Sequence, residues 1–248
     1  MKKIFIDVPL TDEIILPADT THHLLNVFRH KMSKPVLVGG SDGRTATYEL
    51  LDVTDGQARA RMLADGVVLD DDVEIVLVQG FLKADKLELV LQKATELNVH
   101  TLYAANMKNC VAQYKDNKLP QKIERWQKII KEAAQQCGRS KLPVLEAQLS
   151  VEDIIAKETN PNTLLLVAYE NEQSLTLKDA LQRNGGNGEE NGFSRVLIFI
   201  GPEGGLTPQE VADFEAAGVK SVTLGHTILR AETAAIGAVS MLQYELNM

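Results

Sequence analysis

The sequence predicts an α/β protein in which a small β-rich domain precedes a larger domain built on a parallel sheet. In the first part of the chain, short runs rich in β-branched residues are separated by glycine-containing turns, a pattern typical of a small barrel. From residue 84 onward, helical and strand patterns alternate, which indicates a parallel sheet. We expect the boundary near residues 70–75, where three aspartates follow one another, and therefore domains 1–72 and 73–248.

The elements of the small domain follow from alternating or apolar runs that end at turn residues. A short helix is expected over residues 19–29. Strands are expected over residues 3–8, 35–38, 45–53, 58–63 and 73–78, and together they describe a small barrel.

In the larger domain, apolar residues at helical spacing alternate with short apolar runs. The helices are expected over residues 84–97, 120–136, 175–183 and 234–246, with a further helix after Ser150. The strands are expected over residues 144–148, 163–170, 195–200 and 221–225. Trp126, within the second of these helices, is expected to be a core residue or an interface anchor.

A glycine-rich corner follows the strand at 195–200. Because that strand is apolar without alternation, it is expected to be buried on both faces of a parallel sheet. In the following segment, Gly201-Pro202-Glu203-Gly204-Gly205, we expect glycines with positive φ and close approach of a ligand to the backbone. The alternative is a tight connection that binds nothing.

Directly after this corner, residues 207–210 fit a capping box, with Pro208 at the first helical position. Free N–H groups and the positive end of a helix dipole should therefore lie beside the glycine loop.

A second corner follows the strand at 221–225, where residues 226–233 lead into the last helix. Loops at the carboxyl ends of neighbouring parallel strands face the same crevice, so the two corners should converge. Glu232 suits a helix amino terminus, whereas Arg230 opposes the helix dipole, which indicates a functional role. The alternative is a surface ion pair between these two side chains.

Neither corner has the Rossmann pattern, and the chain has no P-loop pattern. The segments GPEGGLTPQEV (201–211) and LGHTILRAETA (224–234) resemble the two signatures of the RsmE family, ribosomal RNA methyltransferases that form N3-methyluridine in 16S rRNA. Residues 82–99, 124–144 and 28–31 are also similar to that family, so the resemblance spans essentially the whole chain.

The resemblance implies a SPOUT-type α/β domain, whose carboxyl-terminal trefoil knot holds S-adenosyl-L-methionine, preceded by a PUA-like, RNA-binding β-barrel. It also implies a homodimer that acts on 16S rRNA or the small ribosomal subunit. The implied cofactor contacts are Ile200, Gly201, Pro202, Glu203, Gly204, Gly205, Leu224, Gly225, Ile228, Leu229 and Arg230. The chain departs from the family pattern at His226 and Thr227, where the family has proline and arginine, at Asn98, and in residues 106–111.

The implied reaction constrains the catalytic residues. Uracil N3 carries a hydrogen, and its loss spreads negative charge to the flanking carbonyl oxygens, so a cation or N–H donor should stabilise that charge. We expect Arg230 to be that cation, with Glu203 and Glu232 as orienting groups or bases. The target uridine must be unpaired or extruded from a helix.

The charge distribution points to an RNA-binding region. The net charge is −8, yet residues 83–141 carry an excess of +6 and residues 142–248 carry −9. Phosphate binding depends on local clustering, so the middle of the chain is the candidate RNA face, although a solvated helix surface would also explain these charges. The expected RNA-binding residues are Lys122, Arg125, Lys128 and Arg139, together with Arg29 and Lys31 from the resemblance.

Other features exclude several classes of protein. Cys110 and Cys137 are too few for a disulfide framework or a zinc site. The adjacent residues His22 and His23 do not share a helix face, so no metal is expected. Without a signal peptide or a membrane-length apolar stretch, the protein is expected to be cytoplasmic.

Two other functions are compatible with parts of the sequence. One is a non-catalytic RNA-binding ribosome-assembly factor, and the other is an enzyme that holds a phosphate ligand at the helix capped by Thr207. A pure RNA binder has no need for two glycine-containing corners, so we favour the methyltransferase.

Overall fold

The computed structural model describes residues 3–66, 73–83, 85–112, 118–139, 141–147, 149–185 and 192–247. The chain forms two compact units. The amino-terminal unit contains residues 1–70 and 131–142, and the carboxyl-terminal unit contains residues 71–130 and 143–248. The sequence prediction placed residues 131–142 in the second domain. The three aspartates at the expected boundary lie outside the described residues.

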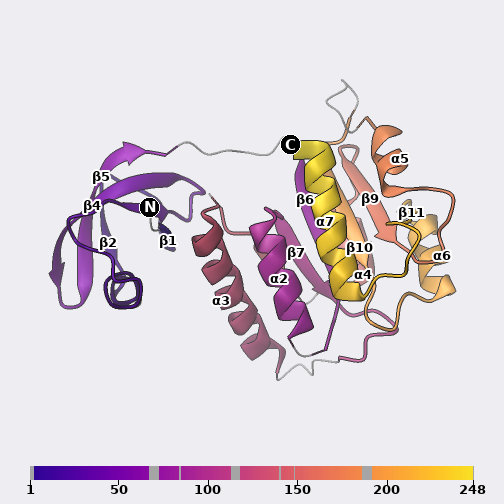
Figure 1. Ribbon diagram of the computed structural model, residues 1–248, viewed down its shortest axis with the longest axis horizontal. Coiled ribbons are helices and arrows are strands. Elements are labelled where there is room, and N and C mark those ends of the chain that lie inside the picture. Colours follow the sequence, from indigo (N-terminus) through magenta and orange to yellow (C-terminus); the bar gives the residue numbers. More distant parts are fainter. Residues whose placement is uncertain are drawn as a thin grey trace. The chain divides into compact units, whose positions relative to one another are not determined.

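The amino-terminal unit is built on a five-stranded mixed sheet (Figure 1). Only β1 and β3 pair in parallel, and the other neighbours are antiparallel. Its apolar core includes Ile4, Leu16 and Tyr48. In the order of the sheet, the strands are β1 (Lys3–Phe5), β3 (Val36–Gly39), β4 (Thr45–Thr54), β5 (Gln57–Asp65) and β2 (Glu13–Leu16), of which β2 was not predicted.

The helix expected over residues 19–29 is shorter and irregular. The α-helix α1 (Ala18–His22) continues as a π-helical turn, η1 (His23–Val27). Phe28 N donates to the carbonyl of His23, five residues earlier, and this longer spacing widens the turn. Arg29 lies beyond the helix with φ of 50°, so it is not part of a regular last turn.

The carboxyl-terminal unit contains a six-stranded sheet in which every neighbouring pair is parallel. The strand order is β11 (Lys220–Val222), β9 (Thr163–Ala168), β10 (Arg195–Ile200), β6 (Glu74–Gly80), β7 (Thr101–Ala105) and β8 (Val144–Glu146). The run at 73–78 was grouped with the strands of the barrel, which was wrong, although the expected domain bounds assigned it to residues 73–248. It forms most of β6, whose nearly continuous burial is typical of a central parallel strand.

Helices connect these strands, and Figure 1 shows α2 and α7 side by side over the sheet. The helices are α2 (Lys86–Glu96), α3 (Leu119–Cys137), α4 (Val151–Glu158), α5 (Leu177–Gln182), α6 (Pro208–Ala216) and α7 (Ala231–Asn247). Trp126 on α3 is buried, with its ring centroid 6.3 Å from that of Phe81, so it is a core residue.

The observed bounds of the last strand and the last helix differ from the predicted ones, and they determine which residues form the second corner. Strand β11 ends at Val222, and Thr223 forms only an isolated bridge with Thr176. Helix α7 begins at Ala231, three residues earlier than expected, so Arg230 directly precedes its first residue. Over the described ranges, no helix is long and apolar enough to cross a membrane, and no group of three metal-binding side chains occurs.

Candidate functional site

The two corners line one cavity of about 330 Å³ in the carboxyl-terminal unit, at the carboxyl end of β10. Of the predicted cofactor contacts, Leu224 and Gly225 do not line it. The cavity also includes Lys86 and Glu170, which the sequence did not suggest. The lining residues from the corners are Ile200, Gly201, Pro202, Glu203, Gly204, Gly205, Leu206, Ile228, Leu229, Arg230, Ala231, Glu232 and Ala234.

The predicted capping box is present at the start of α6. Thr207 Oγ1 accepts a hydrogen bond from Glu210 N at 3.1 Å, and Glu210 Oε2 accepts one from Thr207 N at 2.8 Å. The other carboxylate oxygen accepts from Lys108 N at 2.8 Å. Burial acts to raise the pKa of Glu210, but these hydrogen bonds outweigh it and lower the pKa. The glutamate therefore ties the helix start to the segment after β7.

The glycines of the first corner have different roles. Of Gly201, Gly204 and Gly205, only Gly205 has positive φ, at 69°, so the expectation for the other two was wrong. A Cβ at Gly204 would lie 2.8 Å from Asn109 O, and Asn109 Nδ2 donates to Gly204 O at 3.1 Å and Gly205 O at 3.2 Å. The missing side chain at Gly204 thus admits the backbone of Asn109, while the same glycine also lines the cavity.

A buried glutamine holds the same loop from the neighbouring strand. Gln79, 1% exposed on β6, donates through Nε2 to Gly80 O at 3.0 Å and Gly201 O at 3.1 Å. A Cβ at Gly80 would approach Pro202 N to 2.9 Å, so this glycine lets the loop pass close to β6. Neither Gln79 nor Asn109 was predicted from the sequence. The signal for Gln79 was a polar glutamine that directly follows the apolar run 75–78.

Two carboxylates of the cavity share one lysine. Lys86 Nζ lies 3.8 Å from Glu203 Oε1 and 3.3 Å from Glu232 Oε2. Glu203 Oε1 also accepts from Lys83 N at 3.0 Å, while its buried Oε2 has no hydrogen-bond partner among the described residues. The pKa of Glu232 is lowered by a hydrogen bond from its own backbone N–H, and further by Lys86 and Arg230.

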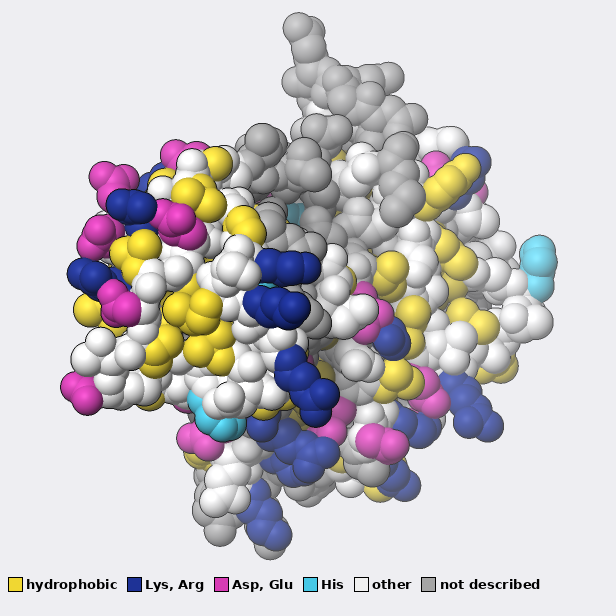
Figure 2. Space-filling view, turned by 60° about the vertical axis from the view of Figure 1, so that its left-hand side comes forward, with side chains coloured by type: hydrophobic (Ala, Val, Ile, Leu, Met, Phe, Trp, Pro, Cys, Tyr) yellow, Lys and Arg dark blue, Asp and Glu magenta, His cyan; other side chains and the backbone are white. Residues whose placement is uncertain are grey.

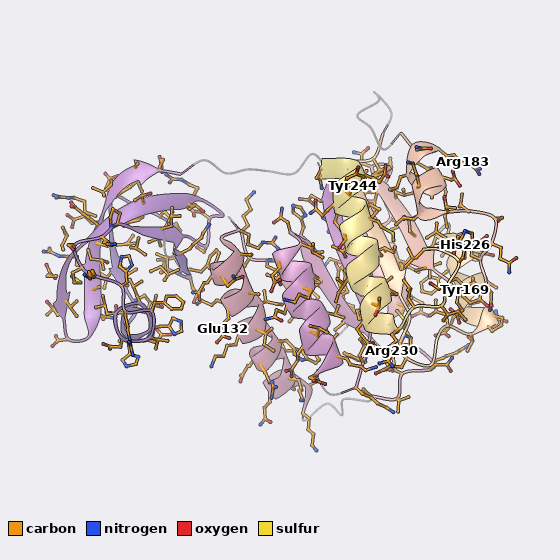
Figure 3. The ribbon with its side chains drawn as sticks, viewed as in Figure 1. Glu132, Tyr169, Arg183, His226, Arg230 and Tyr244 are labelled. Carbon is orange, nitrogen blue, oxygen red and sulfur yellow. The ribbon has the colours of Figure 1, made fainter. Side chains whose placement is uncertain are left out.

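Arg230 is exposed and stands at the amino-terminal end of α7, while Tyr244 lies toward the other end (Figure 3). Its guanidinium makes no hydrogen bond or ion pair with the residues that the structure describes. A cation at a helix amino terminus is unfavourable, so its position is not explained by helix stability. The guanidinium is available to a ligand in the adjoining cavity.

Arg29 and Lys31 line a separate cavity of about 1100 Å³ within the amino-terminal unit, together with Lys3, His30 and Lys34. Lys3 is buried, its Nζ donates to Thr45 Oγ1 at 3.1 Å, and burial lowers its pKa. In Figure 2, Lys and Arg side chains lie at the surface of the face in view, with Asp and Glu side chains among them. The local excess of cations is a feature that phosphate groups favour.

The other predicted RNA-binding residues divide between the two units. Lys122, Arg125 and Lys128 lie on the part of α3 that belongs to the carboxyl-terminal unit, and Arg125 Nη2 pairs with Glu88 Oε2 at 2.6 Å. Arg139 belongs to the amino-terminal unit and does not line the cavity of the two corners.

Comparison with known proteins supports one family. The family of the RNA methyltransferase domain matches residues 70–243. The chain is 29% identical to the ribosomal RNA small subunit methyltransferase E of Bacillus subtilis, over all of this chain and 98% of that protein. The crystal structure of ribosomal RNA small subunit methyltransferase E from Neisseria gonorrhoeae, bound to S-adenosyl methionine, is 26% identical with a TM-score of 0.84, covering 98% of this chain and 97% of that one.

A methyltransferase structure from Legionella pneumophila, in complex with the bound cofactor SAM, is also similar. It is 26% identical with a TM-score of 0.83, and the match covers 98% of this chain and 96% of that one. Since the family match extends over more than two thirds of the sequence, from β6 to most of α7, this chain belongs to the RNA methyltransferase domain family.

Proposed function

We propose that this protein transfers a methyl group from S-adenosyl-L-methionine to N3 of a uridine in 16S ribosomal RNA. The observation that carries the proposal is the convergence of both signature corners on one cavity at the carboxyl end of β10. Ligands of open parallel sheets bind at such strand ends. The names of the relatives from Bacillus subtilis and Neisseria gonorrhoeae agree with this activity.

The residues of the cavity fit S-adenosylmethionine. The volume of the cavity is within the range of small-molecule sites, and one of its walls is the backbone of residues 201–205. Glu203 offers a buried oxygen without a partner among the described residues, which suits a hydroxyl or ammonium donor. The carboxylates of Glu170, Glu203 and Glu232 also favour a cationic ligand.

When bound, the cofactor supplies an electrophilic methyl sulfonium, and the protein must prepare uracil N3 as the nucleophile. Arg230 stabilises the negative charge that forms on a uracil carbonyl oxygen when N3 loses its proton. The amino terminus of α7 contributes in the same direction.

Glu232 acts as an orienting group. Its lowered pKa makes it a weak proton acceptor, and its carboxylate is already engaged by Lys86 and its own N–H. Of the two candidate bases, Glu203 retains a buried oxygen without a partner in the described part of the chain.

The wider organisation that we propose follows the family resemblance. The carboxyl-terminal segment forms a SPOUT-type trefoil knot, the mixed sheet is a PUA-like RNA-binding domain, and the protein acts as a cytoplasmic homodimer. The segment that leads from β11 to α7 lies beside the 201–205 loop, as a cofactor-holding knot requires. Arg29, Lys31, Lys122, Arg125, Lys128 and Arg139 contact the RNA.

Two measurements test the function. Calorimetric titration should detect binding of S-adenosylmethionine and no binding of ATP. Purified protein with cofactor should then create a reverse-transcription stop in 16S rRNA, because a methyl on N3 blocks Watson–Crick pairing. Binding of RNA without cofactor would instead support an assembly factor, and binding of ATP would support a phosphate-ligand enzyme.

A further inference from the structure

Lys86 is the first residue of α2 and lies between carboxylates from two other segments. Its ammonium is 3.3 Å from Glu232 Oε2, in the first turn of α7, and 3.8 Å from Glu203 Oε1, in the glycine corner. The side chain of Lys86 is 35% exposed, whereas those of Glu203 and Glu232 are 19% and 14% exposed. Because both carboxylates are largely shielded from water, their pairs with Lys86 are less screened than pairs between fully exposed side chains.

The segment before α2 makes a second contact to the same loop. Lys83 N donates to Glu203 Oε1 at 3.0 Å, so the oxygen that faces Lys86 also receives a backbone hydrogen bond. The start of α2 therefore holds the glycine corner through Glu203 and the start of α7 through Glu232. These are the two walls of the cofactor cavity, and no other described side chain pairs with both glutamates.

Besides holding the two walls together, Lys86 offsets the negative charge of the carboxylates in the cavity. The charged groups of the cavity are Lys86, Arg230, Glu170, Glu203 and Glu232. Without Lys86, Arg230 would be the remaining cation among these described groups, and the pKa of Glu232, which Lys86 helps to lower, would rise. A protonated Glu232 would present a different hydrogen-bonding surface to the ligand.

We propose that Lys86 is a positioning residue, which fixes the two corners relative to each other and so places the carboxylates of Glu203 and Glu232 for binding of the cationic cofactor. The proposal rests on the proposed function, because it assigns the cavity to S-adenosylmethionine. Lys86 does not itself react. It acts through the two glutamates, and we assign it an effect on affinity and on the pH dependence of methyl transfer.

The test compares Lys86→Met, Lys86→Arg and Lys93→Met. Lys93 lies on the same helix, where it forms an i,i+3 pair with Glu96 and lines neither cavity. Lys86→Met should weaken cofactor binding about tenfold, the effect of losing a charged hydrogen bond. Hydrogen exchange of the amides at 201, 203–205 and 230–233 should accelerate, and the acidic limb of the single-turnover rate should move to higher pH.

Lys86→Arg should restore most of the affinity and protection, since a guanidinium can bridge both carboxylates. Lys93→Met should resemble the wild type. Wild-type exchange, affinity and pH profile in Lys86→Met would overturn the proposal, as would an equal loss in Lys93→Met. Hydrogen exchange needs no cofactor, so it still tests Lys86 if the wild type fails to bind S-adenosylmethionine, a failure that would instead refute the proposed function.

Discussion

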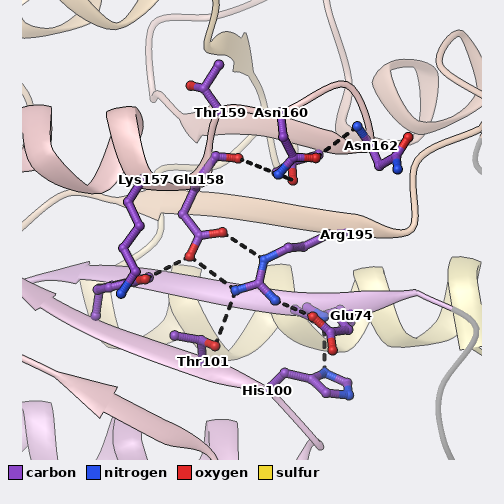
Figure 4. Close-up of polar contacts among 12 residues, drawn as sticks. Glu74, His100, Thr101, Lys157, Glu158, Thr159, Asn160, Asn162 and Arg195 are labelled. Carbon is purple, nitrogen blue, oxygen red and sulfur yellow. Dashed lines mark hydrogen bonds and ion pairs between the residues drawn. The ribbon is translucent and has the colours of Figure 1, made fainter.

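Arg195 and Glu158 form a bidentate ion pair at the end of the parallel sheet opposite to the candidate site. Arg195 Nε donates to Glu158 Oε2 at 2.7 Å and Nη2 donates to Oε1 at 3.1 Å (Figure 4). Tyr103 Oη donates to Glu158 Oε1 at 2.7 Å, and Arg195 also pairs with Glu74. The network joins the first residue of β10 to the end of α4, so it supports the strand whose other end carries the glycine corner.

This pair predicts an acid-sensitive contribution to stability. Burial acts to raise the pKa of Glu158, but hydrogen bonds from Arg195 and Tyr103 outweigh it, so the folded-state pKa is lowered. The contribution is therefore complete above the unfolded pKa of about 4.3 and is lost as pH falls through the lower folded value. Glu158→Gln should reduce the free energy of unfolding by about 3 kcal/mol at pH 7.

Denaturant unfolding between pH 3 and pH 7 measures this effect. The difference between wild type and Glu158→Gln should shrink as the pH falls below about 4, because the unfolded chain takes up its proton first, and the loss is complete only below the lower folded-state pKa. Lys178→Met is the control, because it removes the exposed pair with Glu245 and should cost less than about 1 kcal/mol. A difference that stays constant across this pH range would contradict an ionised Glu158.

Gly204→Ala should lower stability as well as cofactor affinity. The added Cβ would lie 2.8 Å from both Asn109 Cβ and Asn109 O, so either the loop or the segment after β7 must move. Overpacking of this kind costs about 1 to 3 kcal/mol. Thermal unfolding and calorimetric titration should report both losses in the same variant.

Gly237→Ala is the matched control for that experiment. It lies within α7, and an added Cβ there meets no heavy atom within 4 Å in the described part of the chain. It should stabilise the helix by roughly 0.5 to 1 kcal/mol and leave affinity unchanged. If Gly204→Ala lost affinity at wild-type stability, the glycine would be needed for the ligand and not for Asn109.

Neutralising Lys122, Arg125 and Lys128 together should weaken binding to 16S rRNA and reduce its salt dependence. Glutamine tests this better than glutamate does, because a glutamate at position 125 would lie beside Glu88, the present partner of Arg125, and repel it. The slope of log K against log salt should fall by about two to three if all three contact phosphates. Filter binding at several salt concentrations measures the slope.

The control for the RNA experiment carries the same change in net charge elsewhere. Lys178, Arg183 and Lys220 lie in the acidic carboxyl-terminal part of the sequence and line none of the cavities described above. Their replacement by glutamine should leave the slope unchanged. Equal effects of both triple variants would indicate a general electrostatic contribution and not a local RNA face.

Local sequence signals predicted those parts of the site that neighbouring residues determine. The capping box is such a case, because its two partners, Thr207 and Glu210, lie three residues apart in the sequence. The convergence of the corners followed from the rule that parallel strands end at one edge of the sheet. By contrast, the run 73–78 predicted a strand but not its partners, since an apolar run fits a barrel and a central parallel strand equally well.

Contacts between distant residues were not predictable in the same way. Lys86, Asn109 and Gln79 each contact the glycine corner, more than 90 residues away in the sequence, and lysine and asparagine are common on surfaces. Only the fold shows that these side chains point to the glycine corner. The positive φ expected at Gly201 and Gly204 was wrong for a related reason, because a glycine can be required by a neighbouring backbone as well as by its own dihedral angles.

Arg230→Lys should fold and bind S-adenosylmethionine but transfer methyl groups far more slowly. Lysine keeps the positive charge and loses the planar guanidinium that can engage a carbonyl oxygen and a second acceptor together. Since the charge on uracil develops mainly in the transition state, the loss should appear in turnover and not in cofactor affinity. Removal of comparable donors costs about 3 to 4 kcal/mol, a decrease on the order of hundreds-fold.

Primer extension on rRNA from cells that carry only the variant measures this loss, because the reverse-transcription stop at the methylated uridine should weaken or disappear. Single-turnover assays with saturating cofactor then separate the chemical step from binding. Arg183→Lys is the control, since Arg183 follows α5 and lines neither the cofactor cavity nor the basic cavity. A full-strength stop and a wild-type single-turnover rate for Arg230→Lys would show that the bidentate geometry of Arg230 has no part in stabilising the uracil anion, and that another group supplies this function.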